Sequence, residues 1–227
     1  MNAFNLNHLR VLITQASTFM GPALVATFRK LGATVIADDS DPARPGQAEH
    51  IIKAAGTIDA MLVNLAMPAP NTPADEVTDE EWQAVFSSMV TPLQQLVRAA
   101  LPDMKARHSG KIVLMGSAAA LRGMANRSAY AAARGAQLSY VQAVGVEVAR
   151  HGIQVNAIAQ NFVDNPTYFP PEVQALPAFQ ERLKREVPLG RLVSAEEDAQ
   201  FAAYLCSAAA NCFVGQVFPV CGGWVTR

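Results

Sequence analysis

The 227-residue sequence contains only three cysteines, and their spacing matches neither a CxxC pair nor a metal site. An odd number of scattered cysteines is typical of reduced thiols, so we expect a cytoplasmic protein. An excess of basic residues is also absent. The sequence has 18 lysines and arginines and 19 aspartates and glutamates, which gives a net charge of -1. Without a basic stripe, neither nucleic acid nor an anionic membrane is an expected partner.

Long hydrophobic runs are absent as well, and no apolar segment reaches the length needed to span a membrane. Residues 1–7 lack the basic-then-apolar pattern of a signal peptide. The four histidines are scattered, so no metal site is expected. These absences leave an enzyme or binding protein for small molecules as the broad class.

Half of the residues are apolar, which allows a sizeable core in a single domain spanning residues 1–227. Short β-branched runs alternate with segments of helical periodicity, a pattern typical of a mostly parallel, doubly wound α/β sheet. The expected strands cover residues 10–14, 33–37, 58–64, 111–115, 153–158 and 216–220. The expected helices cover residues 21–31, 47–55 and 78–108, an Ala-rich segment ending at 148, and two stretches after 171.

Two local signals refine the helices. Capping boxes are predicted at Thr78–Glu81 and at Ser194–Glu197, because a serine or threonine precedes a glutamate by three residues. Pro92 lies inside the first of these helices, so a kink or local break is expected there.

Ser117, Tyr130 and Arg134 form the strongest chemical constellation. Ser117 ends an apolar strand, and Tyr130 and Arg134 are four residues apart, hence on one face of the following helix. A free tyrosine has a pKa near about 10, and a guanidinium about 4 Å away lowers it by at most about three units. Tyr130 is therefore the candidate base, Arg134 its electrostatic support and Ser117 the partner of a substrate oxygen. The alternative is a Tyr and an Arg that merely share an exposed helix face.

The turn after the first strand distinguishes between functions. A dinucleotide site needs glycines there so that the backbone can approach the pyrophosphate. Between Thr14 and Gly21, only Gly21 is a glycine, and Phe19 places a ring where a phosphate needs open space. This turn suits a small dry pocket, unless Phe19 simply packs in the core.

The order of elements, the Ser117–Tyr130 pair and the Gly222-Gly223 ending resemble the short-chain dehydrogenase/reductase family over essentially the whole chain. This resemblance implies a Rossmann-like fold. The departures from the family pattern are specific. Gln15 and Phe19 replace the first two glycines of its fingerprint, and Arg134 takes the position of the lysine that follows the catalytic tyrosine.

Two further family features are altered. The Asn-Asn-Ala-Gly stretch is reduced to Asn64-Leu65-Ala66-Met67, and the helical asparagine of the proton relay falls at Met89. The lysine and asparagine of the relay and most cofactor glycines are therefore missing together.

These departures resemble the halohydrin dehalogenases, an offshoot of the same family. Their signatures, Thr-x4-Phe/Tyr-x-Gly and Ser-x12-Tyr-x3-Arg, match Thr14 to Gly21 and Ser117 to Arg134 without a gap. The resemblance implies that Tyr130 deprotonates a vicinal haloalcohol whose oxygen Ser117 holds, so that an epoxide, a halide and a proton form without a nicotinamide cofactor. It also implies the reverse opening of epoxides by small anions, and a homotetramer.

The resemblance further places the halide and substrate pocket at residues drawn from three parts of the chain. These residues are Phe19, Gln160, Asn161, Phe162, Tyr168 and Phe169. Asn161 and Phe162 could equally shape an ordinary turn. Trp224, near the end of the chain, is placed as a candidate to reach the site of a neighbouring subunit.

Two alternatives remain open. The first is an NAD(P)-dependent short-chain dehydrogenase/reductase with an eroded fingerprint, in which Asp38 would bind the ribose hydroxyls. The second is a non-catalytic scaffold that retained the fold, against which the intact trio of Ser117, Tyr130 and Arg134 argues.

Overall fold

The computed structural model describes residues 5–226. Residues 1–4, part of the segment in which no signal peptide is expected, and residue 227 lie outside the described residues. Within the described part, no helix combines the length and the apolar character required to cross a membrane.

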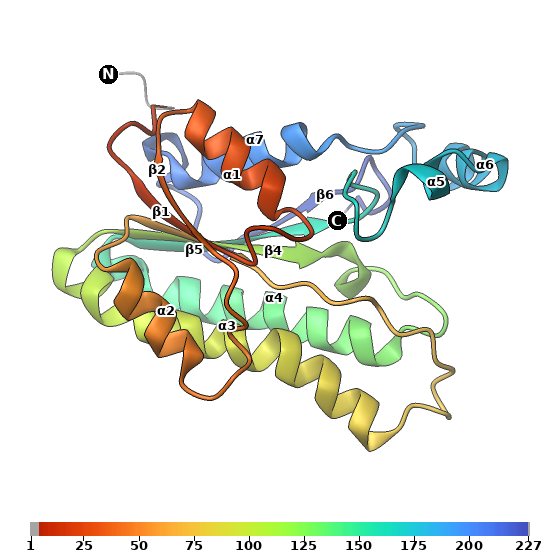
Figure 1. The fold of residues 1–227 in the computed structure, drawn as a ribbon, viewed down its shortest axis with the longest axis horizontal. Helices are drawn as coiled ribbons and strands as arrows, with labels where there is room; N and C mark the ends of the chain where they lie inside the picture. The colour runs from red at the N-terminus through yellow and green to blue at the C-terminus, as the bar shows by residue number, and fades with distance from the viewer. Residues whose placement is uncertain (1–4, 227) are drawn as a thin grey trace.

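Six parallel strands form one sheet in the order β2-β1-β3-β4-β5-β6 (Figure 1). The strands are β1 (Arg10–Thr14), β2 (Thr34–Asp38), β3 (Ala60–Asn64), β4 (Gly110–Ser117), β5 (Ile153–Gln160) and β6 (Val217–Val220). The chain runs from β1 to β2 on one side and to β3 on the other, so the direction of winding switches at β1. Ligands of such sheets bind beyond the carboxyl ends of the strands near this switch.

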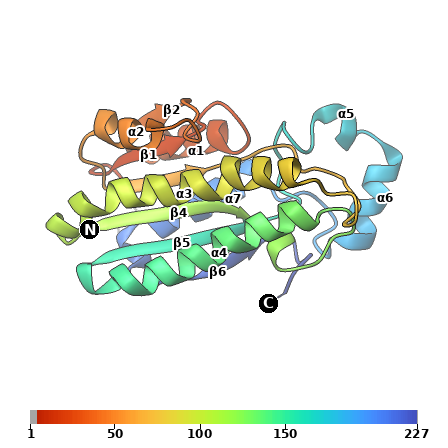
Figure 2. The same cartoon turned by 90° about the horizontal axis from the view of Figure 1, so that it is seen from below.

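Helices cover both faces of the sheet, as Figures 1 and 2 show. On one face lie α1 (Gly21–Lys30) and α7 (Ala195–Cys206), and on the other α2 (Gln47–Ala55), α3 (Asp79–Arg107) and α4 (Ser128–Val148). The short helices α5 (Pro171–Gln174) and α6 (Pro177–Glu186) lie beyond the carboxyl ends of the strands. The predicted Rossmann-like, doubly wound parallel α/β fold is therefore confirmed.

The buried strands explain this architecture. All five residues of β3 are buried, as are four of the five in β1, and they belong to one apolar layer on each side of the sheet. A strand buried on both faces reads as a continuous apolar run, which is the pattern of a parallel sheet covered by helices.

Helix α3 runs from Asp79 to Arg107 without interruption, so the local break that was one of the two outcomes expected at Pro92 does not occur. Pro92 is buried, and its neighbours Met89 and Leu93 are completely buried. The carbonyl of Met89, in the turn before the proline, accepts a hydrogen bond from the Gln137 side chain at 2.8 Å. Packing against α4 therefore outweighs the proline cost of about 3 kcal/mol.

One of the two expected capping boxes forms completely, and the other forms only in part. At α7, Ser194 accepts from the Glu197 N–H and the Glu197 carboxylate accepts from the Ser194 N–H, so the box is complete. At α3, Thr78 caps the Glu81 N–H, but the Glu81 carboxylate accepts from the Thr72 hydroxyl instead. That bond fixes the proline-rich loop before α3.

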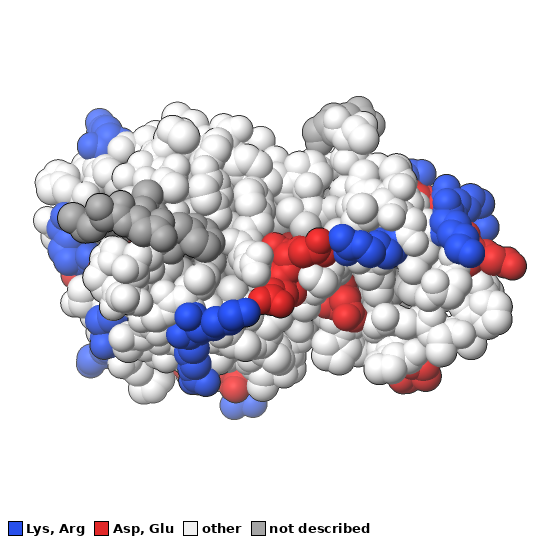
Figure 3. Space-filling model, turned by 90° about the horizontal axis from the view of Figure 1, so that it is seen from above, with Lys and Arg blue, Asp and Glu red and all other residues white. Residues whose placement is uncertain are grey.

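Charged residues of both signs are interspersed on the α1–α7 face. Figure 3 shows no continuous area of lysine and arginine over the described part of this face. Exposed ion pairs account for part of the mixture, including Lys30 with Glu196 at 2.9 Å.

Candidate active site

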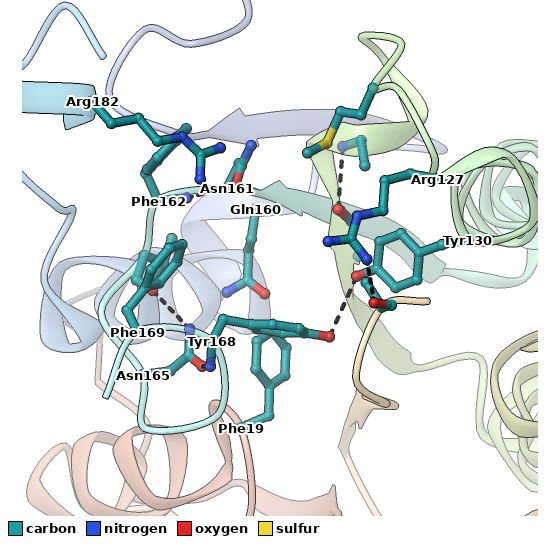
Figure 4. Close-up of a pocket in the computed structure, with 16 residues that line it drawn as sticks. Phe19, Arg127, Tyr130, Gln160, Asn161, Phe162, Asn165, Tyr168, Phe169 and Arg182 are labelled. Atoms are coloured by element: carbon teal, nitrogen blue, oxygen red, sulfur yellow. Dashed lines mark hydrogen bonds between the residues drawn. The ribbon is translucent and has the colours of Figure 1, made fainter. Parts of the chain in front are cut away.

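A cavity of about 200 Å³ opens at the carboxyl ends of the strands (Figure 4). It is bounded by the end of β4, the start of α4 and the loop after β5. Nearly every residue proposed from the sequence meets here, namely Phe19, Ser117, Tyr130, Gln160, Asn161, Phe162, Tyr168 and Phe169. Arg134 lies behind Tyr130, fully buried. The cavity suits a small molecule, since typical pockets for larger ligands have about 300–1,000 Å³.

Tyr130 and Arg134 form the buried centre of the site. The Nε of Arg134 donates to the phenol oxygen of Tyr130 at 3.1 Å, across one turn of α4. Arg134 is completely buried and Tyr130 is 7% exposed. A charge-assisted hydrogen bond in a dry environment is strong, and here it stabilises the phenolate.

The pKa of Tyr130 is lowered from its ordinary value of 10.0. Burial acts to raise it, but the charge of Arg134 and contacts from Tyr168, Arg134 and Ser117 outweigh burial. The pKa of Tyr168 is raised, first by its own burial and then by the charge of Tyr130. The two phenol oxygens are 3.5 Å apart, so the environment separates them into a base and a permanent donor.

Ser117 is the last residue of β4 and is 9% exposed, facing the cavity. Its hydroxyl oxygen accepts from the Ala119 N–H at 3.2 Å and caps the short 3-10 turn after the strand. That bond leaves the hydroxyl proton free to donate to a substrate oxygen. The predicted trio therefore comes together at one wall of the cavity.

Gln137 is a positioning residue that the sequence patterns did not reveal. Its Oε1 accepts from Nη1 of Arg134 at 3.0 Å, and its Nε2 donates to the Met89 carbonyl of α3 at 2.8 Å. Nη1 also donates to the Met115 carbonyl at 3.3 Å. These bonds fix the plane of the guanidinium and aim Nε at Tyr130. Gln137 looked like one polar position among many in an Ala-rich helix.

In the turn after β1, two non-glycine residues adopt backbone conformations that usually require glycine. Gln15 and Phe19 both have positive φ, at 46° and 52°, the left-handed region that glycine adopts without strain. Gly21 remains because a Cβ there would lie 2.3 Å from the Gln15 carbonyl oxygen. Strained non-glycine residues cluster at functional sites, where the surrounding structure stabilises them.

Phe19 is a wall between two cavities. It is 6% exposed, its ring packs edge-on against Tyr168 at 5.4 Å, and it lines both the catalytic cavity and a neighbouring one of about 360 Å³. Phe19 therefore belongs to the core and to the site at once.

The second cavity is a poor match for a dinucleotide. Its lining residues include Asp39 and Asp41 but no lysine or arginine. The Asp39 carboxylate already accepts the Ser17 N–H of the first turn at 2.7 Å, where a phosphate would need that donor. The Asp38 carboxylate accepts from the backbone and hydroxyl of Ser40, at 3.0 and 3.3 Å. The residues present do not fit a nicotinamide cofactor.

Asn165 organises the loop after β5. Its side-chain oxygen accepts from the N–H groups of Thr167 and Tyr168, and its amide donates to the Val163 carbonyl at 2.7 Å. This ties Tyr168 in place, and the Tyr168 hydroxyl donates to the Met67 carbonyl at 2.6 Å. Asn165 was missed because asparagine is common in ordinary turns.

Gln160 and Phe162 lie where β5 passes into the following loop. Gln160 is the last residue of β5 and pairs with Val220 of β6, so the strand extends two residues beyond the expected end at residue 158. Phe162 has a positive φ of 51° and is 1% exposed, and its N–H donates to the Asn161 side chain at 2.9 Å. Phe169 stacks on Phe162 with ring centroids 5.9 Å apart. Asn161 and Phe162 therefore shape the turn and line the cavity.

Two arginines also line the cavity and were not anticipated. Arg127 donates to the carbonyls of Ala69 and Pro70, which anchors the proline-rich loop at the cavity wall. The guanidinium of Arg182 lies 5.2 Å from the centre of the Phe162 ring, at the opposite side in Figure 4.

Trp224 packs within its own chain, and its reach into a neighbouring subunit stays a prediction. It is 7% exposed within its own chain, and its ring lies 6.1 Å from that of Phe162. Arg122 covers its other side, with 4.7 Å from the guanidinium to the ring centre. A side chain already packed in its own core has little surface left to reach a neighbouring subunit.

Asp198 of α7 is a completely buried acid beside the cavity wall. Its Oδ2 accepts from Nε2 of Gln160 at 2.5 Å. Burial raises its pKa from 3.8 to about 7, with the Gln160 contact opposing that rise. The folded protein therefore holds a proton that the unfolded chain loses above about pH 4.

Asp198→Asn removes this linkage. In the wild type, the raised pKa of Asp198 contributes to the free energy of unfolding at low pH. This contribution, about 4 kcal/mol at most, is lost as the pH rises from about 4 to about 7. The variant is expected to be about 2–4 kcal/mol more stable than the wild type at pH 8, with no such gain at pH 4. Urea unfolding at both pH values measures this, and an equal difference at the two values would contradict it.

Comparison with known proteins agrees with this geometry. The family model described as enoyl-(acyl carrier protein) reductase matches residues 10–225. The chain belongs to the short-chain dehydrogenase/reductase superfamily. Within the superfamily, it is 33% identical over 171 residues to cis-4-hydroxycyclohexanecarboxylate dehydrogenase of Sinomonas cyclohexanicum, covering 74% of this chain and 66% of that relative.

Two solved structures are also similar to this chain. A protein described as a dehalogenation enzyme has a TM-score of 0.91 and 32% identity, over 97% of this chain and 100% of its own. A halohydrin dehalogenase bound to ethyl (2S)-oxiran-2-ylacetate has a TM-score of 0.88 and 26% identity, over 96% and 98%. This chain is thus similar in sequence to a dehydrogenase and in structure to two proteins described as dehalogenases.

Proposed function

We infer that the protein is a cofactor-independent halohydrin dehalogenase, which converts vicinal haloalcohols to epoxides and catalyses the reverse opening by small anions. The observation that carries this proposal is the buried Tyr130–Arg134 pair beside a small cavity that Phe19 closes toward the would-be cofactor groove. A candidate base beside a small cavity supports the proposal, and so does the poor fit of the neighbouring cavity to a dinucleotide. The similarity to two dehalogenase structures supports the same conclusion.

The reaction follows from the roles of these groups. Ser117 donates a hydrogen bond to the substrate hydroxyl oxygen while the phenolate of Tyr130 removes its proton. The resulting alkoxide attacks the neighbouring carbon, so a C–O bond forms as the carbon–halogen bond breaks. The bonding pair leaves with the halide, and the proton on Tyr130 passes to solvent. No hydride moves, and the charge of Arg134 favours the ionised form of Tyr130 between turnovers.

The halide needs donors in a poorly hydrated place. Among the described residues, the Val163 N–H has no hydrogen-bond partner, and Val163 is 2% exposed where it lines the cavity. Phe19 and Phe162 line the same cavity and exclude water. This corner is the proposed halide site.

The other candidate is an NAD(P)-dependent reductase, which the names of the sequence relatives favour. That function would require phosphate binding at a turn where Asp39 holds the Ser17 N–H and Phe19 blocks the way. NADH titration separates the two functions, because a reductase must bind the cofactor.

The assembly is proposed to be a homotetramer built on α3 and α4, which lie side by side on one face (Figure 2). Trp82 on α3 and Val146 on α4 are 43% and 73% exposed, and such apolar side chains favour an interface. The expected partners are otherwise haloalcohols, epoxides, halides and small anionic nucleophiles.

Opening of an epoxide tests the proposal in the reverse direction. A small terminal epoxide and azide, without nicotinamide, are expected to give the azido alcohol at a rate proportional to enzyme. Gas chromatography of the product, with heat-inactivated enzyme as control, measures this. Formation of azido alcohol only in the presence of NADH would contradict the proposal.

A further inference from the structure

Gln160 and Asp198 form an isolated polar pair beneath the catalytic cavity. Gln160 is 5% exposed and lines the cavity at the end of β5, while Asp198 is completely buried on α7. Among the described residues, Oε1 of Gln160 and Oδ1 of Asp198 have no hydrogen-bond partner. Figure 4 shows the Gln160 amide reaching toward the part of the cavity between Tyr168 and Tyr130. A buried acceptor without a donor costs about 1–3 kcal/mol, so this arrangement calls for an explanation.

One proton gives Oε1 of Gln160 the donor that it lacks. If Asp198 is the neutral acid and the Gln160 amide is rotated by half a turn, the acid O–H donates to Oε1. The 2.5 Å separation matches an O–H···O bond, which spans about 2.5–3.0 Å, better than an N–H···O bond of about 2.7–3.2 Å. The amide then presents its NH₂ group, instead of its oxygen, to the cavity.

An N–H donor in the cavity would stabilise a bound anion. Gln160 lines the same cavity as Val163 and the aromatic walls of the proposed halide corner, and an amide oxygen turned into that cavity would repel an anion. We propose that the neutral acid of Asp198 turns the Gln160 amide so that its NH₂ group binds the departing halide or the incoming anion. Gln160 is thus a specificity-determining residue and Asp198 is the positioning residue that sets its orientation. This inference rests on the proposed dehalogenase function.

Among the described residues, the side chain of Asp198 has its polar contact with Gln160, and the charged residues nearby pair with other partners. On its own helix, Glu196 pairs with Lys30 of α1 and Glu197 pairs with Arg191, all at the surface. From β4, Lys111 bonds to Asn211 at the opposite end of the sheet.

Other ionisable groups line the cavity and would affect anion binding there. Among the described residues that line it, these are Tyr130, Tyr168, Arg127 and Arg182. Of these groups, Tyr130 has a lowered pKa, and its ionisation would place a negative charge beside a bound anion. The experiment therefore uses a variant without the Tyr130 hydroxyl.

Chloride binding in the Tyr130→Phe background isolates the pair, since no phenolate forms there. The linewidth of ³⁵Cl NMR, with azide as competitor, reports binding without any turnover. With Asp198 intact, affinity is expected to fall about tenfold or more between about pH 6 and pH 8.5, as the acid ionises and the amide turns back. Adding Asp198→Asn keeps a permanent donor to Oε1, so affinity is expected to stay within about twofold of its low-pH value.

A second variant tests the amide directly. Gln160→Met is close in size and lacks the donor, so chloride affinity is expected to fall about tenfold at pH 6 and to lose its dependence on pH. The same pH dependence with and without Asp198→Asn, or unchanged affinity in Gln160→Met, would overturn the inference. Either result would leave the dehalogenase function standing if the wild type releases halide. No chloride binding at any pH would overturn the inference, and failure of the wild type to release halide would separately overturn the function.

Discussion

Tyr130→Phe is expected to lower bromide release from a vicinal bromo-alcohol by about 10³-fold or more, because the reaction loses its general base. The phenol oxygen is the group that Arg134 contacts at 3.1 Å, and its pKa is held below the ordinary value in that position. Removing one oxygen leaves the ring packed in place. Initial rates of bromide release, with circular dichroism and thermal unfolding to verify the fold, measure the effect.

Tyr168→Phe is the matched control. Its hydroxyl lies 3.5 Å from that of Tyr130, but its pKa is raised and it donates to the Met67 carbonyl. It should therefore lose only about tenfold or less, the scale of one supporting hydrogen bond. If Tyr168→Phe were inactive and Tyr130→Phe retained near-normal rates, the two phenols would have the opposite roles.

Arg134→Met is expected to move the pH profile of kcat/KM upward. Without the guanidinium, the largest influence that lowers the pKa of Tyr130 is lost, so burial outweighs the remaining contacts of Tyr168 and Ser117 and the pKa of the phenol rises. A base with a higher pKa is less ionised at neutral pH, and the rate falls tenfold for each unit of rise, about 10²–10³-fold in all. The rate should recover steadily as pH increases, which a profile from neutral to alkaline pH measures.

Arg134→Lys separates charge from shape. It keeps a cation but loses the fork that bonds to Tyr130, Met115 and Gln137, so its profile should lie between those of the wild type and Arg134→Met. An unchanged profile in a folded Arg134→Met protein would show that Arg134 does not set the ionisation of Tyr130.

The strands and the site could be predicted because both depend on local patterns. A run such as Ala60–Asn64 is buried throughout and has few alternatives in a chain of this length. Ser117 and Tyr130 meet because strand ends and helix starts of parallel units share one edge of the sheet. Pro92 shows the limit, since a local rule predicted a kink or a break there, and the contacts of α3 with α4 keep the helix free of a break.

The residues that were missed depend on contacts between distant segments. Asp198 follows a capping box, where acids usually face solvent, and only the fold shows that it is buried against Gln160 of β5. Gln137 is recognisable only when α3 places the Met89 carbonyl beside it. The packing of Trp224 against Phe162 within the same chain was likewise not predicted, because it too joins distant segments. Periodicity identifies buried faces but not the polar pairs within them.

The most direct test of cofactor-independent dehalogenation is the release of bromide and acid from 1,3-dibromo-2-propanol by the purified protein without nicotinamide, alongside a fluorescence titration with NADH. Our account predicts equal amounts of bromide, proton and epoxide, with no saturable NADH binding. Saturable NADH binding together with no bromide release would contradict it, and would place the chain with the reductases of its superfamily.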